Sequence, residues 1–134
     1  MKFVAHPEDI PIHIEEVGYI QDKAHDVNGF GGISYLCEKS YRTGQSVQIK
    51  LTEIDPDFCV VGRIFKCEKE EGVFRIFIEF PKKEDCYCVR MIEQLSHIEH
   101  YRRQAKKQGR RLSFNEAAIE WIQKFAASFP ELNP

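Results

Sequence analysis

The segment with the clearest chemical potential is a glycine-rich stretch that runs from Asn28 to Leu36. Gly29, Gly31 and Gly32 are three of the eight glycines of the chain, and they fall within four residues. Successive backbone N–H groups in glycine turns can form a concave site for an anion. The alternative is a tight turn that leads into a strand, because glycine also serves where the backbone needs positive φ or close approach. The stretch lacks the Gly-x-Gly-x-x-Gly and Gly-Lys-Ser/Thr patterns of phosphate loops.

Two cysteines and two histidines have a spacing that could hold a metal ion. Cys86 and Cys88 are separated by one residue, and His97 and His100 lie three residues apart on a predicted helix. Thiolate and imidazole are the usual ligands of zinc, but a zinc knuckle separates its cysteines by at least two residues. Buried structural thiols are the alternative, since free cysteine behaves as a small hydrophobe. We therefore expect neither a metal nor another cofactor.

A run of six cations without an acid extends from Arg102 to Arg111. Such a run can meet nucleic-acid phosphates or an acidic protein surface. It can also be the solvated end of a helix, where cations complement the helix dipole. No aromatic residue interleaves with the cations to stack on bases, so nucleic acid is the less favoured partner. The candidate partner-binding residues are Arg102, Arg103, Lys106, Lys107, Arg110 and Arg111.

The sequence shows no arrangement of side chains typical of catalysis. None of its serines lies in a Gly-x-Ser-x-Gly elbow. Glu15–Glu16 and Glu70–Glu71 are adjacent pairs whose side chains diverge on a strand or loop, which suits solvation better than acid–base work. His13 alternates with isoleucines and is expected at the surface. We predict a protein without enzymatic activity.

Composition places the chain among ordinary soluble globular proteins. It has 134 residues, of which 43% are hydrophobic and 30% charged, with a mean hydropathy of -0.43. No apolar run reaches the roughly 20 residues that span a bilayer, and no signal peptide is evident. The five cysteines are irregularly spaced and odd in number. This favours a reducing compartment, and we expect a cytoplasmic location.

Alternating apolar residues predict five strands before residue 81. The predicted strands cover residues 10–20, 32–37, 46–54, 58–66 and 73–80. Short alternating strands without intervening helices indicate an antiparallel sandwich or a small barrel. The charge balance supports a boundary near residue 81, because the chain carries 9 basic against 14 acidic residues through Phe80 and 10 against 7 afterwards.

After this boundary the apolar period becomes helical. A first helix is predicted over about 86–108 and a second over about 114–128, opened by a capping box at Ser113–Glu116. We expect this hairpin to pack on the barrel or on another subunit, which allows a homo-oligomer. The predicted stripe of the first helix is Met91, Leu95, Ile98, Arg102 and Ala105. The predicted stripe of the second helix is Ala118, Trp121, Ile122, Phe125 and Phe129.

Taken in order, these pieces resemble the PilZ family of bacterial cyclic di-GMP receptors. The similarity covers about residues 2–82: a short arm before Ile10–Ile14, the turn ending at Gly31–Ile33, and the later segments Gly44–Leu51, Val61–Ile64 and Phe74–Phe80. The resemblance implies a six-stranded antiparallel PilZ-type β-barrel over residues 1–82, followed by a helical extension over 83–134. A sixth strand would then lie at about 15–27. It also implies bacterial second-messenger signalling, in which nucleotide binding alters contact with a partner protein.

The resemblance places the candidate cyclic di-GMP site at the arm and the glycine turn. The family's Arg-x-x-x-Arg falls nearest Lys2 to His6, with two basic residues at the right interval and no arginine. Its Asp/Asn-x-Ser-x-x-Gly aligns on residues 27–32, where the final glycine is kept and the acid and serine positions are not. The candidate ligand-binding residues are Lys2, His6, Asp26, Asn28, Gly29, Gly31 and Gly32.

These substitutions leave two functions open. An arginine fork that reads guanine contributes about 1–3 kcal/mol, and neither lysine nor neutral histidine reproduces it. The chain is therefore expected to be a PilZ adaptor that acts through protein contacts, with nucleotide binding weak or lost. The alternative is a true cyclic di-GMP receptor that uses Lys2, His6 and the Asn28–Gly32 turn. A weaker alternative is nucleic-acid binding through Arg102–Arg111.

Overall fold

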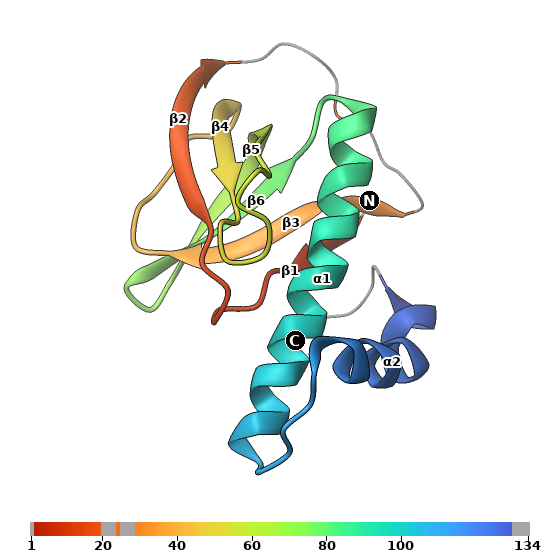
Figure 1. Ribbon diagram of the computed structural model, residues 1–134. Helices are drawn as coiled ribbons and strands as arrows, with labels where there is room; N and C mark the ends of the chain where they lie inside the picture. The colour runs from red at the N-terminus through yellow and green to blue at the C-terminus, as the bar shows by residue number, and fades with distance from the viewer. Residues whose placement is uncertain (1, 20–23, 25–28, 130–134) are drawn as a thin grey trace.

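The computed structural model describes residues 2–19, 24 and 29–129, which form six strands followed by two helices (Figure 1). The prediction of a mainly β chain with two C-terminal helices is confirmed. The strands are β1 (Lys2–Ala5), β2 (His13–Tyr19), β3 (Phe30–Cys37), β4 (Gln45–Lys50), β5 (Val60–Glu70) and β6 (Val73–Glu79). The helices are α1 (Lys83–Lys107), α2 (Phe114–Phe125) and the short 3-10 helix η1 (Ala126–Ser128).

The six strands form one mixed, open sheet in the order β1-β3-β6-β5-β4-β2. β1 runs parallel to β3, whereas the other neighbouring pairs are antiparallel. The predicted antiparallel barrel is therefore wrong in two respects, strand direction and closure. β1 and β2 remain the two edges of the sheet. The connection between them, residues 6–12, contains Pro7 and Pro11, which have no N–H to donate to a ladder.

The sixth strand is not where the resemblance placed it. Residues 13–19 form a single strand, β2, where a break after Ile14 was expected. The additional strand is β1, at the beginning of the chain. β1 has a short apolar pattern, with Phe3 and Val4 between polar or small residues, and four residues are too few to show a clear period. Its position in the sheet is determined by pairing with β3, a non-local contact.

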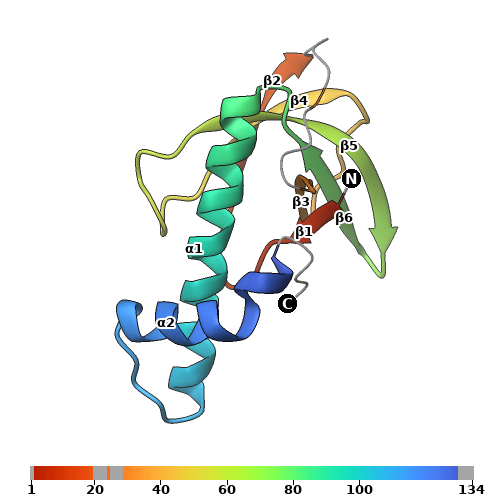
Figure 2. The ribbon, with the colours of Figure 1, turned by 90° about the vertical axis from the view of Figure 1, so that its right-hand side faces the viewer.

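One face of the sheet forms the core, and α1 covers it. The fully buried side chains of Ile33, Ile76 and Ile78 lie on this face, with Ile33 opposite Ile78 in the ladder. α1 packs across β3 and β5, as the two perpendicular views show (Figures 1 and 2). α2 crosses the C-terminal half of α1 and buries Trp121 against it. Sheet and helices thus share one hydrophobic core.

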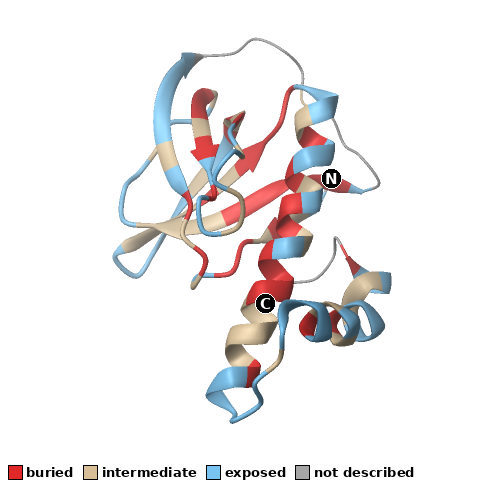
Figure 3. Ribbon diagram, in the orientation of Figure 1, coloured by how far each residue is buried: buried red, intermediate tan, exposed pale blue. Residues whose placement is uncertain are grey.

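The buried face of α1 differs from the predicted stripe. Met91 and Leu95 were expected to be buried, but they are 63% and 39% exposed. Buried and exposed residues alternate along α1 (Figure 3). The buried face of α1 includes four polar residues, which a search for apolar spacing does not detect. They are Glu93, Ser96, His97 and Glu99. The stripe predicted for the second helix is confirmed at Trp121 of α2 and at Phe129, which follows η1, whereas Ile122 is exposed.

The predicted capping box at the start of α2 is present. The Ser113 hydroxyl accepts a hydrogen bond of 3.1 Å from the Glu116 backbone N–H, and the Glu116 carboxylate accepts one of 2.9 Å from the Ser113 backbone N–H. Both bonds satisfy donors at the helix terminus that have no partner inside the helix.

Replacing Ser113 by alanine should therefore destabilise the protein modestly. Loss of a serine N-cap costs about 1 kcal/mol, and the N–H of Glu116 then depends on water. The change is measured by urea unfolding monitored through Trp121, the single tryptophan, which lies in the capped helix. Ser113→Asp supplies the matched control, because aspartate caps about as well as serine. Equal losses in both variants would contradict a capping role.

Candidate functional site

The glycine turn has a structural role that does not require a ligand. Gly32 has φ of 152° and contacts β6 so closely that an added Cβ would lie 1.9 Å from the Ile78 carbonyl oxygen and 3.0 Å from the Phe3 ring. Gly31 is buried beside it, and Gly29 has φ of 78° at the surface. Gly32 is thus required for the close approach of β3 and β6. Asp26 and Asn28 lie outside the described residues.

The two basic residues of the N-terminal arm share one face of β1 but have different environments. Side chains alternate along a strand, so Lys2, Val4 and His6 point toward the side on which α1 packs. Lys2 is exposed. His6, just after the strand, is 4% exposed. The interval that the resemblance selected therefore places one candidate ligand residue in solvent and the other in the interior.

His6 is held by two hydrogen bonds within the protein. Its Nε2 donates to the Ile10 carbonyl oxygen at 2.6 Å, and its Nδ1 lies 2.7 Å from Oε2 of Glu93 in α1. Neither side chain of this pair is exposed. Burial by itself lowers the pKa of His6, but the Glu93 carboxylate and the Ile10 carbonyl outweigh it and raise the pKa above 6.5. The pair is a buried imidazolium–carboxylate contact between the arm and α1.

A second histidine lies on the other side of Glu93. Nε2 of His97 is 3.9 Å from Oε1 of Glu93, and both atoms are buried without a hydrogen-bond partner. Burial lowers the pKa of His97 from 6.5 to about 4, so its imidazole is neutral near pH 7. Sequence reasoning named His97 as a metal ligand candidate and missed Glu93. Glu93 gave no signal of burial in the sequence, because a charged residue in a helix is expected at the surface.

The opposite face of the sheet carries three phenylalanines from three strands. Phe3, Phe65 and Phe77, here called the aromatic patch, have ring centroids 5.3 Å apart for both the Phe3–Phe65 and Phe3–Phe77 pairs. Phe65 is 40% exposed, and the Lys66 ammonium lies 4.4 Å from the centre of the Phe77 ring. Aromatic faces beside cations can stack planar ligands. The patch borders Gly32, because Phe3 pairs with that residue.

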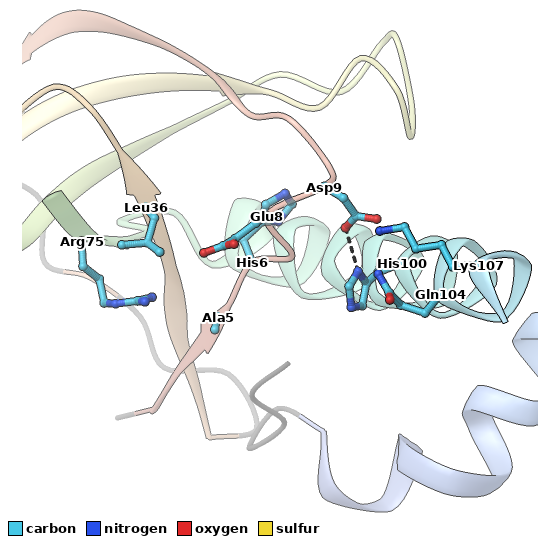
Figure 4. A pocket seen from close by; sticks show the side chains of 9 residues that line it. All are labelled: Ala5, His6, Glu8, Asp9, Leu36, Arg75, His100, Gln104 and Lys107. Carbon is cyan, nitrogen blue, oxygen red and sulfur yellow. Dashed lines mark hydrogen bonds and ion pairs between the residues drawn. The ribbon is translucent and has the colours of Figure 1, made fainter. Parts of the chain in front are cut away.

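A cavity of about 410 Å³ lies between β3, residues 6–9 and the C-terminal half of α1 (Figure 4). Arg75 is at one end and Lys107 at the other, with Glu8 and Asp9 between them. Oδ1 of Asp9 lies 2.7 Å from Nδ1 of His100. Two acids thus offset the two permanent cations. The cavity does not concentrate the positive charge that a dianionic nucleotide requires.

The structure divides the basic run into paired and unpaired cations. Arg102 and Arg103 both bond the Glu99 carboxylate, and Arg103 also bonds Glu53 at 2.9 Å. Arg110 forms two hydrogen bonds with Glu120. The paired arginines of the run therefore form ion pairs within the folded protein. Within the run, the exposed cations for which the described residues provide no ion pair are Lys106, Lys107 and Arg111.

The cysteine–histidine set does not form a cluster. Cys86 is fully buried and directs its thiol toward the Phe30 carbonyl at 3.7 Å, whereas Cys88 is exposed. His97 and His100 face different partners, Glu93 and Asp9. No group of three or more potential metal ligands occurs in the described part of the chain.

The described helices include none that is both long and apolar enough to cross a membrane. Comparison of the chain with models of protein families, with curated proteins and with solved structures found no match.

Proposed function

We propose that this protein is a signalling adaptor of the PilZ type that acts through protein contacts and binds cyclic di-GMP weakly or not at all. One observation carries the proposal: His6, the second basic position of the arm, is buried with both ring nitrogens bonded inside the protein. Binding a nucleotide through His6 would first require breaking a buried ion pair, which costs several kcal/mol. The open, mixed sheet of this chain differs from the closed, antiparallel barrel that the resemblance implies.

The distribution of exposed apolar side chains supports protein contact by the helices. Of the eight large hydrophobic residues exposed in the described chain, six lie on α1 and α2. Tyr87, Met91 and Leu95 follow one another at intervals of four on α1, so they form one ridge. Clustered exposed apolar side chains mark interaction surfaces more often than scattered ones do.

The test is calorimetric titration of cyclic di-GMP into the full chain at physiological salt. We expect no heat of binding up to about a millimolar, a free energy weaker than roughly -4 kcal/mol. Lys2→Ala is the appropriate variant for the arm, because Lys2 is exposed and its removal should leave the fold intact. Binding at low micromolar concentration that Lys2→Ala abolishes would overturn the adaptor proposal.

A second candidate, the cyclic di-GMP receptor, is favoured by the aromatic patch alone. Phe3 pairs with Gly32 in the ladder and Phe77 packs against Phe3, so a base stacked on the patch would lie beside the glycine turn. In this case the ligand would use the patch and the turn, without His6. Phe65→Ala and Phe77→Ala would then weaken binding in the same titration, since base–aromatic stacking contributes about 1–3 kcal/mol.

A further inference from the structure

His97 lies where the arm, α1 and α2 meet. It projects from α1, and its Nε2 lies 3.9 Å from the carboxylate of Glu93, which bonds His6 of the arm at 2.7 Å. Its ring centroid is 6.5 Å from that of Trp121 in α2 and 6.0 Å from that of Phe129 just after η1. The side chain is 2% exposed. A change in the protonation of this imidazole therefore affects the packing of both the N-terminal arm and α2.

One hydrogen bond that could form beside His97, between His97 and Glu93, is not formed. Oε1 of Glu93 and Nε2 of His97 are buried, have no other partner and lie 3.9 Å apart. Two acceptors that face each other gain nothing by approaching. A proton on Nε2 turns the same pair into an ionic hydrogen bond, which is shorter, at about 2.7–2.9 Å. Closing the gap moves the imidazole by about an ångström, away from its present packing.

We propose that His97 is a proton-operated switch that couples the N-terminal arm to α2. Uptake of a proton from solvent on Nε2 draws the imidazole toward Glu93, which already holds His6 of the arm. The ring then leaves its contacts with Trp121 and Phe129, and α2 is held less firmly on α1. The inference does not depend on whether the protein binds a nucleotide.

The other charged groups near His97 set the sign of the switch. His6 and His100 oppose a second positive charge, whereas Glu93 favours it. The Arg90 guanidinium lies over the Phe129 ring, 5.2 Å from its centroid, and Asp9 bonds His100. Because the folded state keeps the pKa of His97 near 4, against 6.5 for an ordinary histidine, the docked arrangement loses stability as pH falls from 6.5 toward 4.

The experiment is a pH titration of the full chain by two-dimensional NMR. Trp121 gives the single indole N–H signal of the protein, and the backbone amide of His6 reports on the arm, because His6 bonds Glu93. We expect both signals to shift with one common midpoint below pH 6.5, while the far-UV circular dichroism of the sheet is unchanged. His97→Gln, which cannot take up the proton, should abolish both shifts.

Two further variants should move the midpoint in opposite directions. Glu93→Gln removes the attracting carboxylate and should lower the midpoint by about 1 pH unit, and His100→Gln removes a repelling charge and should raise it. His13→Gln, an exposed residue of β2, is the matched control and should leave it unchanged. The proposal is overturned if the two signals titrate separately, if the transition survives in His97→Gln, or if it coincides with unfolding of the sheet.

Discussion

Replacing Glu93 by alanine should lower the free energy of unfolding by about 3–5 kcal/mol, the usual loss when one partner of a buried ion pair is removed. The carboxylate is fully buried and is the acceptor for His6 across the interface of arm and helix. Without it, an imidazole whose other nitrogen donates to Ile10 must either stay charged in an apolar site or lose its proton. The loss is large beside a total stability of about 5–15 kcal/mol.

The pH dependence of this loss identifies its origin. The pKa of His6 is raised above 6.5 in the folded protein, because Glu93 and the Ile10 carbonyl outweigh burial. The pair's contribution is therefore fully present below pH 6.5 and is lost as pH rises through the raised pKa. The difference between the wild type and Glu93→Ala in urea unfolding should be greatest on the acid side of neutrality and should shrink in alkaline solution.

A surface ion pair provides the matched control. Glu16 and Lys39 are as close as the buried pair, at 2.8 Å, but both are well exposed. Solvent screens such a pair, so Glu16→Ala should change stability little. A loss in Glu93→Ala that is as small as in Glu16→Ala, or that does not vary with pH, would contradict the ionic assignment of the His6–Glu93 contact.

Local patterns predicted most elements of the fold but not their arrangement. Alternation located the strands near β3, β4, β5 and β6, and the capping box located the start of α2, because these signals depend on neighbouring residues. The parallel pairing of β1 with β3 joins residues about thirty positions apart, and no local signal encodes it. The resemblance supplied a closed barrel in its place, and this was wrong.

The candidate site, like the fold, could be predicted from the sequence only in part. The resemblance selected Lys2 and His6 as a pair, but Lys2 is exposed and His6 is buried against a carboxylate 87 residues away in the sequence. Glu93, Ser96 and His97 are polar residues on the buried face of α1. The apolar stripe drawn from the sequence is therefore correct at Ile98 and Ala105 but wrong at Met91 and Leu95. Buried polar networks depend on partners from distant segments, which one sequence does not reveal.

The second large effect is expected at Gly32, where replacement by alanine should cost about 3–6 kcal/mol, as overpacking and backbone strain combine. The added methyl group would lie 1.9 Å from the Ile78 carbonyl oxygen. That oxygen belongs to the backbone of β6, so no side-chain rotation relieves the clash. β3 must separate from β6 at the residue where β1 also joins the sheet. We expect a large fall in the urea midpoint, followed by Trp121 fluorescence.

Substitutions at two other glycines distinguish the two causes of the expected loss at Gly32, which are steric crowding and backbone strain. Gly29 has φ of 78° and open space around its Cα, so Gly29→Ala tests left-handed strain alone, at about 1–2 kcal/mol. Gly62 has no unusual φ, and its added Cβ would lie 2.5 Å from the Ile78 Cγ2 and 3.1 Å from the Glu79 carbonyl oxygen, so Gly62→Ala tests crowding without left-handed strain. If Gly32→Ala costs no more than Gly29→Ala, the close approach of β3 and β6 is not what requires glycine there. Anion binding by the turn would then be the better explanation for a glycine at position 32.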